Sequence, residues 1–129
     1  MTTETVVPLR WSDMDAMGHV NNATYLTYLE TAREPWFAAI ATEGEYMRFA
    51  MRRIEVDFLS QLRFEDGAVR VTIDLDGVGT TSVRTHERMT AESDGRLVVE
   101  AKAVIVRLDD AGVGSAPLPD DLRARLAAA

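Results

Sequence analysis

The chain carries the sequence RWSDMDAMGHVNNATYLTYLETAR at residues 10–33, and this stretch decides how the remainder is interpreted. Asn21 and Asn22 are both good N-cap residues, so a helix is expected to begin at one of them. From there apolar side chains recur at helical spacing as far as Ile40, which is the pattern of a helix with one buried face. Pro35 lies inside that pattern, and we expect it to kink or interrupt the helix.

Outside the helix the apolar pattern has the period of a β-strand. Ile54, Val56 and Phe58 alternate with charged residues, as in a strand with one buried face. Turn residues separate the later strands, so these are expected to be antiparallel neighbours. One long helix on an antiparallel sheet makes an α+β domain. The expected elements are strands at 6–11, 54–58, 69–75, 80–90 and 96–108, and a short terminal helix at 119–127.

Composition limits the possible classes of function. The 129 residues suffice for one domain with a hydrophobic core, and we expect a single domain over residues 1–129. The sequence has no cysteine, which excludes disulfides, thiolate metal sites and cysteine nucleophiles. A net charge of −7 opposes general binding to nucleic acid or to an anionic membrane. There is no apolar run of membrane-spanning length, and an acid stands where a signal peptide carries positive charge, so we expect a cytoplasmic protein without membrane insertion.

The segment from Asp13 to Asn22 holds the densest group of reactive side chains. It places two carboxylates, Asp13 and Asp15, together with His19 directly before the expected helix. A helix N-terminus offers unpaired N–H groups that suit a developing oxyanion, and a nearby carboxylate can attack a thioester or deprotonate a water. From the residues alone, a capped turn without chemistry fits equally well. His19 and His86 lack the spacing of a zinc site, so no metal is expected.

Residues 10–33 resemble the hot-dog thioesterases of the 4-hydroxybenzoyl-CoA thioesterase type, and also the related plant acyl-carrier-protein thioesterases. The family pattern is aromatic-x-Asp-x-Asp-x-x-Gly-His-Val-Asn-Asn-x-x-Tyr-x-x-Tyr-x-Glu-x-Ala-Arg, and every element has a counterpart between Trp11 and Arg33. The resemblance implies a hot-dog fold, in which an antiparallel sheet of five or six strands wraps around one long helix. It also implies hydrolysis of an acyl-CoA or acyl-carrier thioester to a free acid and a thiol, without a cofactor.

Matched position by position, the resemblance makes Asp15 the catalytic carboxylate, acting as nucleophile or as general base. It gives His19 a supporting part in binding or polarising water or the thioester. Asn22 supplies the backbone N–H that points at the thioester oxygen, and Asn21 is a candidate substrate contact. Met17 departs from the plant enzymes, which typically use an asparagine there, so a plant-type catalytic triad is not expected.

Candidate contacts outside this segment are less specific. Tyr25 could contact the acyl group, although tyrosines on an apolar helix stripe usually belong to the core or to an interface. The resemblance places the nucleotide end of coenzyme A near the later strands, which makes Arg84 and Arg88 candidate phosphate ligands. The same two arginines also fit a solvated strand face. Glu30 and Arg33 have the spacing of a surface ion pair on a helix.

The resemblance also implies an oligomer. Related proteins normally join two sheets edge to edge and build their active sites from both chains, so a homodimer or homotetramer is expected. In some relatives a second acidic residue comes from the other subunit, and Glu55, Asp57 or Glu65 could serve here. Two other functions stay open: a hot-dog module that binds acyl-CoA without hydrolysing it, and a hydratase or dehydratase. Asp15 and His19 favour hydrolysis over the binding module, and the Pro-Gly that follows a hydratase histidine is absent from the sequence.

Overall fold

A computed structural model describes residues 1–42 and 44–129 of the chain. Two short 3₁₀ turns, η1 and η2, accompany the longer elements. None of the helices in the described part is long and apolar enough to cross a membrane. In chain order the elements are β1 (Thr2–Pro8), η1 (Trp11–Asp13), α1 (Asn22–Ala38), α2 (Glu43–Tyr46), β2 (Phe49–Phe58), η2 (Phe64–Asp66), β3 (Ala68–Val78), β4 (Ser82–Ala91), β5 (Leu97–Arg107) and α3 (Asp120–Ala128).

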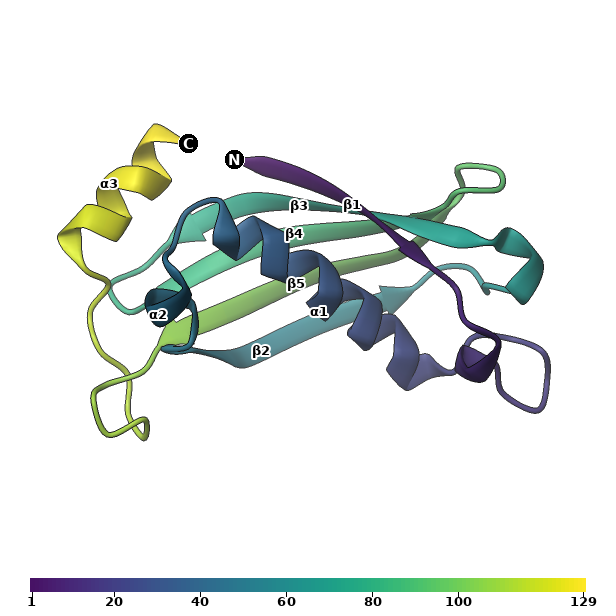
Figure 1. Ribbon diagram of the computed structural model, residues 1–129, viewed down its shortest axis with the longest axis horizontal. Coiled ribbons are helices and arrows are strands. Elements are labelled where there is room, and N and C mark those ends of the chain that lie inside the picture. Colours follow the sequence, from purple (N-terminus) through teal and green to yellow (C-terminus); the bar gives the residue numbers. More distant parts are fainter.

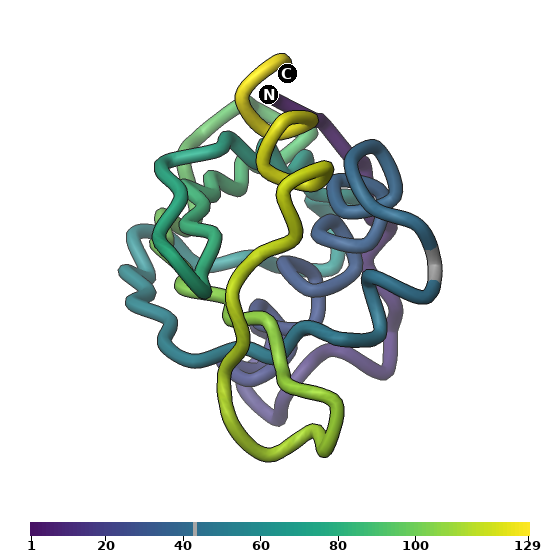
Figure 2. Tube along the Cα trace, turned by 90° about the vertical axis from the view of Figure 1, so that its left-hand side faces the viewer, coloured from purple at the N-terminus to yellow at the C-terminus, as the bar shows by residue number. Residues whose placement is uncertain are grey.

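The five strands form one antiparallel sheet in the order β1-β3-β4-β5-β2. Helix α1 lies along one face of this sheet, and α3 lies at the end where the two chain termini meet (Figure 1). The end-on view shows the same arrangement, with the termini side by side (Figure 2). Strands β1 and β2 are therefore the two edges of the sheet. The α+β architecture expected from the sequence is confirmed.

Alternation along the strands positions the core between the sheet and α1. Strand β3 buries Val69, Val71 and Ile73, and β4 buries every second residue from Val83 to Ala91. A residue on such a strand faces the helix only if its neighbours face away. The arginines of β4 consequently lie on the outer face of the sheet.

Helix α1 begins as expected and is not interrupted at Pro35. Asn21 is the N-cap, and its side-chain oxygen accepts the backbone N–H of Ala23 at 3.0 Å. Of the two outcomes expected at Pro35, an interruption is wrong, because α1 runs through it to Ala38, while a kink stays a prediction. Trp36 follows the proline and is fully buried, so packing on the sheet holds the last turn in place despite the missing backbone hydrogen bond.

The first strand lies earlier than the apolar pattern indicated. It was predicted at 6–11, whereas β1 pairs with β3 from Thr2 opposite Asp74 to Pro8 opposite Ala68. Edge pairing depends on backbone hydrogen bonds, so the polar residues at its start do not prevent it. Trp11 belongs to η1 and is 76% exposed.

Candidate active site

The segment between η1 and α1 folds into a closed loop. Met14 and Val20 form an antiparallel bridge, and the backbone N–H of Asp15 donates to the carbonyl of His19 at 2.8 Å. Gly18 has φ of 77°, in the left-handed region that glycine adopts most readily, and the chain reverses there. The reversal places Asp15 against His19 immediately before the start of α1.

Asp13 is buried and its carboxylate is fully engaged. Arg10 donates to Oδ1 from Nε at 3.1 Å and from Nη2 at 2.8 Å, and its backbone N–H donates to Oδ2 at 3.1 Å. The Tyr28 hydroxyl also donates to Oδ2, at 2.7 Å. Burial raises the pKa of Asp13, but the hydrogen bonds from Arg10 and Tyr28 outweigh it and the pKa lies below its usual value. Asp13 therefore stays ionised and holds the turn.

Asp15 differs from Asp13 because only one of its oxygens is engaged. Oδ1 accepts the backbone N–H of Met17 at 2.9 Å and that of His19 at 3.2 Å. Among the described residues, none donates a hydrogen bond to Oδ2, and the side chain is partly exposed. One oxygen thus fixes the orientation of the carboxylate, and the other is uncommitted. This is the arrangement that a general base or a carboxylate nucleophile requires.

The remaining polar groups of the loop lie beside Asp15 in sequence. The His19 side chain is half-buried, and its ring forms no hydrogen bond with any residue the structure describes. Asn22 is the first residue of α1, and within the described chain its backbone N–H has no acceptor. Asn21, predicted as a substrate contact, uses its side-chain oxygen to cap the helix. The loop therefore combines a carboxylate, an imidazole and a free helix N–H group.

A second segment supports the loop through its backbone. The backbone N–H of Val20 donates to the carbonyl of Leu62 at 2.9 Å, and His19 forms an antiparallel bridge with Arg63. The Tyr25 hydroxyl accepts the N–H of Leu62 at 3.0 Å. Tyr25 is only 1% exposed, so the structure gives it a packing role, and a direct contact with substrate stays a prediction.

A cavity of about 450 Å³ lies between α1 and the edge strand β2. Its volume falls in the range of small-molecule sites, which is roughly 300–1,000 Å³. Apart from Glu30 and Arg33, most of its lining is apolar. The sequence does not show where this cavity lies, because its lining comes from three separate segments of the chain. The apolar lining includes Leu26, Phe37, Tyr46, Met47, Phe49 and Met51.

Arg33, which lines this cavity, forms a buried ion pair that the sequence did not predict. Arg33 donates from Nε and Nη2 to the two carboxylate oxygens of Glu87, both at 2.7 Å. Thr85 adds a hydrogen bond to Glu87 Oε2 at 2.8 Å, and Glu87 is fully buried. The expected surface pair between Glu30 and Arg33 is therefore wrong. The true partner lies 54 residues away on β4, beyond the reach of helix spacing rules.

The candidate phosphate ligands lie apart from the loop. Arg84 and Arg88 belong to the outer face of β4, and among the described residues neither forms a hydrogen bond or ion pair with the loop. Arg88 lies 3.5 Å from Asp74 in an ion pair, whereas Arg84 lines a cleft of about 160 Å³ together with Lys102. Of the candidate second acids, Glu55 lines the same cleft. Asp57 and Glu65 are exposed.

No group of three or more potential metal ligands occurs among the described residues.

The family model of the thioesterase-like superfamily matches residues 9–126. The chain belongs to this superfamily. It is a thioester hydrolase with the hot-dog fold, as the resemblance of residues 10–33 implied.

Solved structures of other thioesterases share this fold. A thioesterase from Thermus thermophilus, complexed with coenzyme A and Zn, is 34% identical with a TM-score of 0.87, and the match covers 97% of this chain and 91% of that one. A protein from Bacillus stearothermophilus described as a predicted thioesterase is 27% identical with a TM-score of 0.88, and coverage is 99% and 96%. A 1,4-dihydroxy-2-naphthoyl-CoA thioesterase from Synechocystis is 15% identical with a TM-score of 0.85 over 98% and 96%, a likeness of fold alone. A comparison with curated proteins finds no significant match.

Proposed function

We propose that this thioester hydrolase acts on an acyl-CoA, with Asp15 as the catalytic carboxylate. The observation that carries the proposal is the state of the Asp15 carboxylate: Oδ1 is held by two backbone N–H groups, and Oδ2 has no donor among the described residues. The N-terminus of α1 begins seven residues later with the free N–H of Asn22. Coenzyme A in the similar Thermus structure supports the choice of thiol.

Two routes fit this geometry, and both end in a free acid and coenzyme A. In the first, Asp15 takes a proton from water while the water oxygen attacks the thioester carbonyl; the thiolate then leaves and takes the proton from Asp15. In the second, Asp15 attacks the carbonyl directly and the thiolate leaves, which forms a mixed anhydride that water hydrolyses. The Asn22 N–H stabilises the oxyanion in either route, and His19 orients the water or the thioester. No cofactor is required because the thioester is already activated.

A single turnover in ¹⁸O-labelled water detects the nucleophilic route when water attacks the Asp15 carbonyl of the mixed anhydride. With enzyme in excess, a nucleophilic Asp15 acquires ¹⁸O when water attacks its side of the anhydride, and mass spectrometry of the peptide detects the gain. Label in the peptide therefore demonstrates the nucleophilic route. A general base, or attack of water on the acyl carbonyl of the anhydride, leaves the peptide unlabelled and places the ¹⁸O in the released acid.

The apolar cavity between α1 and β2 is the proposed site of the acyl group, since its lining suits a hydrocarbon better than a charged nucleotide. Asp15, His19 and Asn22 do not line this cavity; Leu26, one helical turn after Asn22, is its lining residue nearest to them in sequence.

For the phosphates of coenzyme A, Arg84 is favoured over Arg88, because Arg88 is paired with Asp74, whereas three cationic residues (Arg53, Arg84 and Lys102) against two acidic ones (Glu55 and Asp76) line the cleft of Arg84. Arg84→Gln is expected to raise KM for an acyl-CoA. It should leave KM unchanged for the corresponding N-acetylcysteamine thioester, which has no phosphates; an equal effect on both thioesters contradicts this assignment.

We also propose that two copies pair through the β2 edge. This edge exposes Met51 (41%) and Phe58 (48%), and Leu59 (54%) follows directly. Unpaired, apolar strand edges are usually covered in native proteins, and the cavity opens beside this one. Light scattering after size exclusion is expected to give a dimer or tetramer. Met51→Lys should shift the protein towards monomer, and a wild-type monomer would contradict the proposal.

The activity itself is tested with a panel of aromatic, short-chain and long-chain acyl-CoA thioesters and detection of the free thiol. We expect thiol release above the blank for at least one class. A folded protein that releases thiol from none of them would contradict the proposed substrate class.

A further inference from the structure

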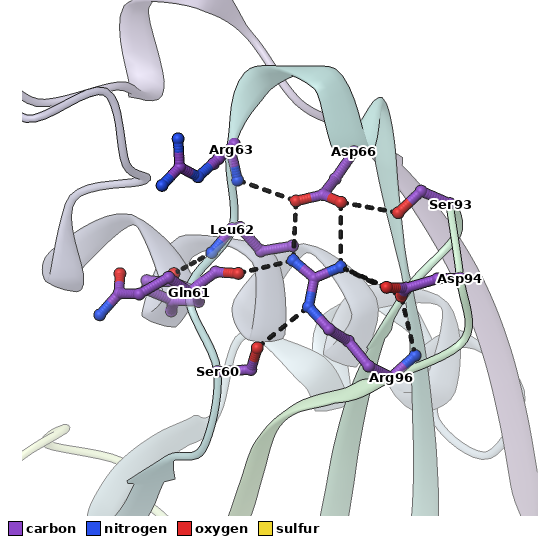
Figure 3. Close-up of polar contacts among 9 residues, drawn as sticks. Ser60, Gln61, Leu62, Arg63, Asp66, Ser93, Asp94 and Arg96 are labelled. Atoms are coloured by element: carbon purple, nitrogen blue, oxygen red, sulfur yellow. Dashed lines mark hydrogen bonds and ion pairs between the residues drawn. The ribbon is translucent and has the colours of Figure 1, made fainter.

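A network around Arg96, in the turn between β4 and β5, binds the segment that supports the catalytic loop. Its guanidinium donates to both oxygens of Asp66, from Nη1 at 3.0 Å and from Nη2 at 2.9 Å. The same side chain donates to the Ser60 hydroxyl at 3.0 Å and to the Gln61 carbonyl at 2.6 Å. Asp94 accepts from Nη1 at 3.0 Å (Figure 3). All three guanidinium nitrogens are therefore used.

Asp66 is the anchor of this network. Its side chain is only 12% exposed, and it also accepts the Ser93 hydroxyl at 2.6 Å and the Arg63 N–H at 2.9 Å. The hydrogen bonds from Arg96 hold the pKa of Asp66 far below its usual value, so the carboxylate is ionised throughout the neutral range. A bidentate pair of this kind fixes geometry as well as charge. Residues 60–66 are thus held against the β4–β5 turn.

Residues 60–66 in turn form the backbone support of the Asp15 loop. Leu62 accepts the N–H of Val20 at 2.9 Å, and Arg63 forms the antiparallel bridge with His19. The His19 backbone holds Asp15 in two ways. Its carbonyl accepts the backbone N–H of Asp15 at 2.8 Å, and its N–H donates to Asp15 Oδ1 at 3.2 Å. Hydrogen bonds, joined by short stretches of backbone in residues 60–66 and at His19 and Val20, therefore connect the Arg96 guanidinium to the Asp15 carboxylate.

We propose that Arg96 is a positioning residue for the active site: through residues 60–66 it holds the loop that orients the Asp15 carboxylate. The inference rests on the proposed role of Asp15. The Arg96 side chain contacts Ser60, Gln61, Asp66 and Asp94. None of these residues lies in the Asp15 loop, so Arg96 acts on the loop indirectly. A change of about 1 Å at a reacting group can cost about 100-fold in rate, so a modest loosening of this segment is sufficient to impair turnover.

Arg70 provides a matched control. It also uses its guanidinium for two carboxylates, Glu92 at 2.7 Å and Glu4 at 3.1 Å, and it is similarly exposed at 41% against 31% for Arg96. Its partners lie on β1 and just after β4, and none belongs to residues 60–66. A general effect of losing a surface arginine should therefore appear equally in both variants.

Arg96→Gln and Arg70→Gln are compared with the wild type below their unfolding temperatures, with the best acyl-CoA of the panel. For Arg96→Gln we expect kcat to fall at least about tenfold with KM within about twofold, since the substrate contacts are untouched. Amide hydrogen exchange at Met17 and His19, whose N–H groups bind Asp15, should rise at least about tenfold. Arg70→Gln should change none of these. An unchanged kcat and unchanged exchange in folded Arg96→Gln would overturn the proposal.

Arg96→Lys keeps the charge but cannot reproduce the bidentate contact, and it serves if Arg96→Gln does not fold. We expect an intermediate kcat and intermediate exchange rates for Arg96→Lys, and wild-type values for both would equally overturn the proposal. The exchange experiment needs no substrate. If the wild type hydrolyses no acyl-CoA, the proposed function fails, while faster exchange around Asp15 in the Arg96 variants still shows that Arg96 holds the loop.

Discussion

Replacing Asn22 with proline removes a single backbone N–H at the start of α1 while leaving the helix able to form. Proline is favoured at the first position of a helix, where the N–H has no intrahelical partner. Asn21, the preceding residue, has φ of −60° and ψ of 138°, which is the conformation preferred before proline. The capping bond from Ala23 to the Asn21 side chain does not involve the lost group. The substitution therefore isolates the proposed oxyanion donor.

The expected magnitude follows from the role of that N–H. Loss of one oxyanion-hole donor typically lowers kcat about 10²–10³-fold, or about 2.7–4 kcal/mol of transition-state stabilisation. A proline that fits its backbone conformation changes the free energy of unfolding by only about 0.4–1 kcal/mol. Asn22→Pro should thus lose most of its activity while keeping nearly all of its stability.

The assay is thiol release at saturating acyl-CoA, combined with thermal unfolding followed by circular dichroism. Asn22→Ala is the comparison, because it removes the carboxamide and keeps the N–H; the ratio of the two kcat values gives the contribution of the N–H alone. If Asn22→Pro is folded and turns over as fast as Asn22→Ala, the backbone N–H of Asn22 is not the oxyanion donor.

Three further predictions concern polar side chains that are buried or nearly buried. Arg33→Met should lower the free energy of unfolding by about 3–5 kcal/mol, because it leaves the buried Glu87 carboxylate without its ion-pair partner. The double variant with Glu87→Met should be closer to wild type. Urea unfolding at one protein concentration checks this, and a double variant as unstable as Arg33→Met contradicts it. The pKa of Asp66 is lowered in the folded state, so its carboxylate stabilises the fold above its unfolded pKa of about 3.9, and this contribution is lost as pH falls through the folded value. The melting temperature of Asp66→Asn should therefore fall less than that of wild type between about pH 5 and 2, and parallel curves would refute this. Tyr28→Phe removes a donor from buried Asp13 and should lower the free energy of unfolding by about 1.5–3 kcal/mol in urea; no change would show that water replaces the hydroxyl.

Much of the fold could be predicted because it is encoded locally. The start of α1 depends on Asn21, whose side chain caps its own helix, and the strands β3 to β5 follow from alternation within each segment. Errors arose where distant residues decide the outcome. Pro35 stays helical because Trp36 packs on the sheet, and β1 extends to Thr2 because β3 supplies its backbone partners.

The candidate site also combines features that are encoded locally with features that depend on distant residues. Asp15, His19 and Asn22 could be proposed together as candidates because one short loop carries all three, and the resemblance implied their roles. The pairs that support them could not be predicted. Arg33 finds its partner 54 residues away, and Arg96 reaches Asp66 across 30 residues. Such pairs depend on the register between strands and on loop packing, for which a single sequence carries no periodic signal.

The most direct test of the account is the kcat of Asp15→Asn on the acyl-CoA that wild type hydrolyses best. The asparagine side-chain oxygen can still accept the N–H groups of Met17 and His19, so the loop should keep its form while the charge is lost. The account predicts a fall in kcat of about 10²–10⁴-fold with a melting temperature close to wild type. A folded Asp15→Asn enzyme with full kcat would contradict it.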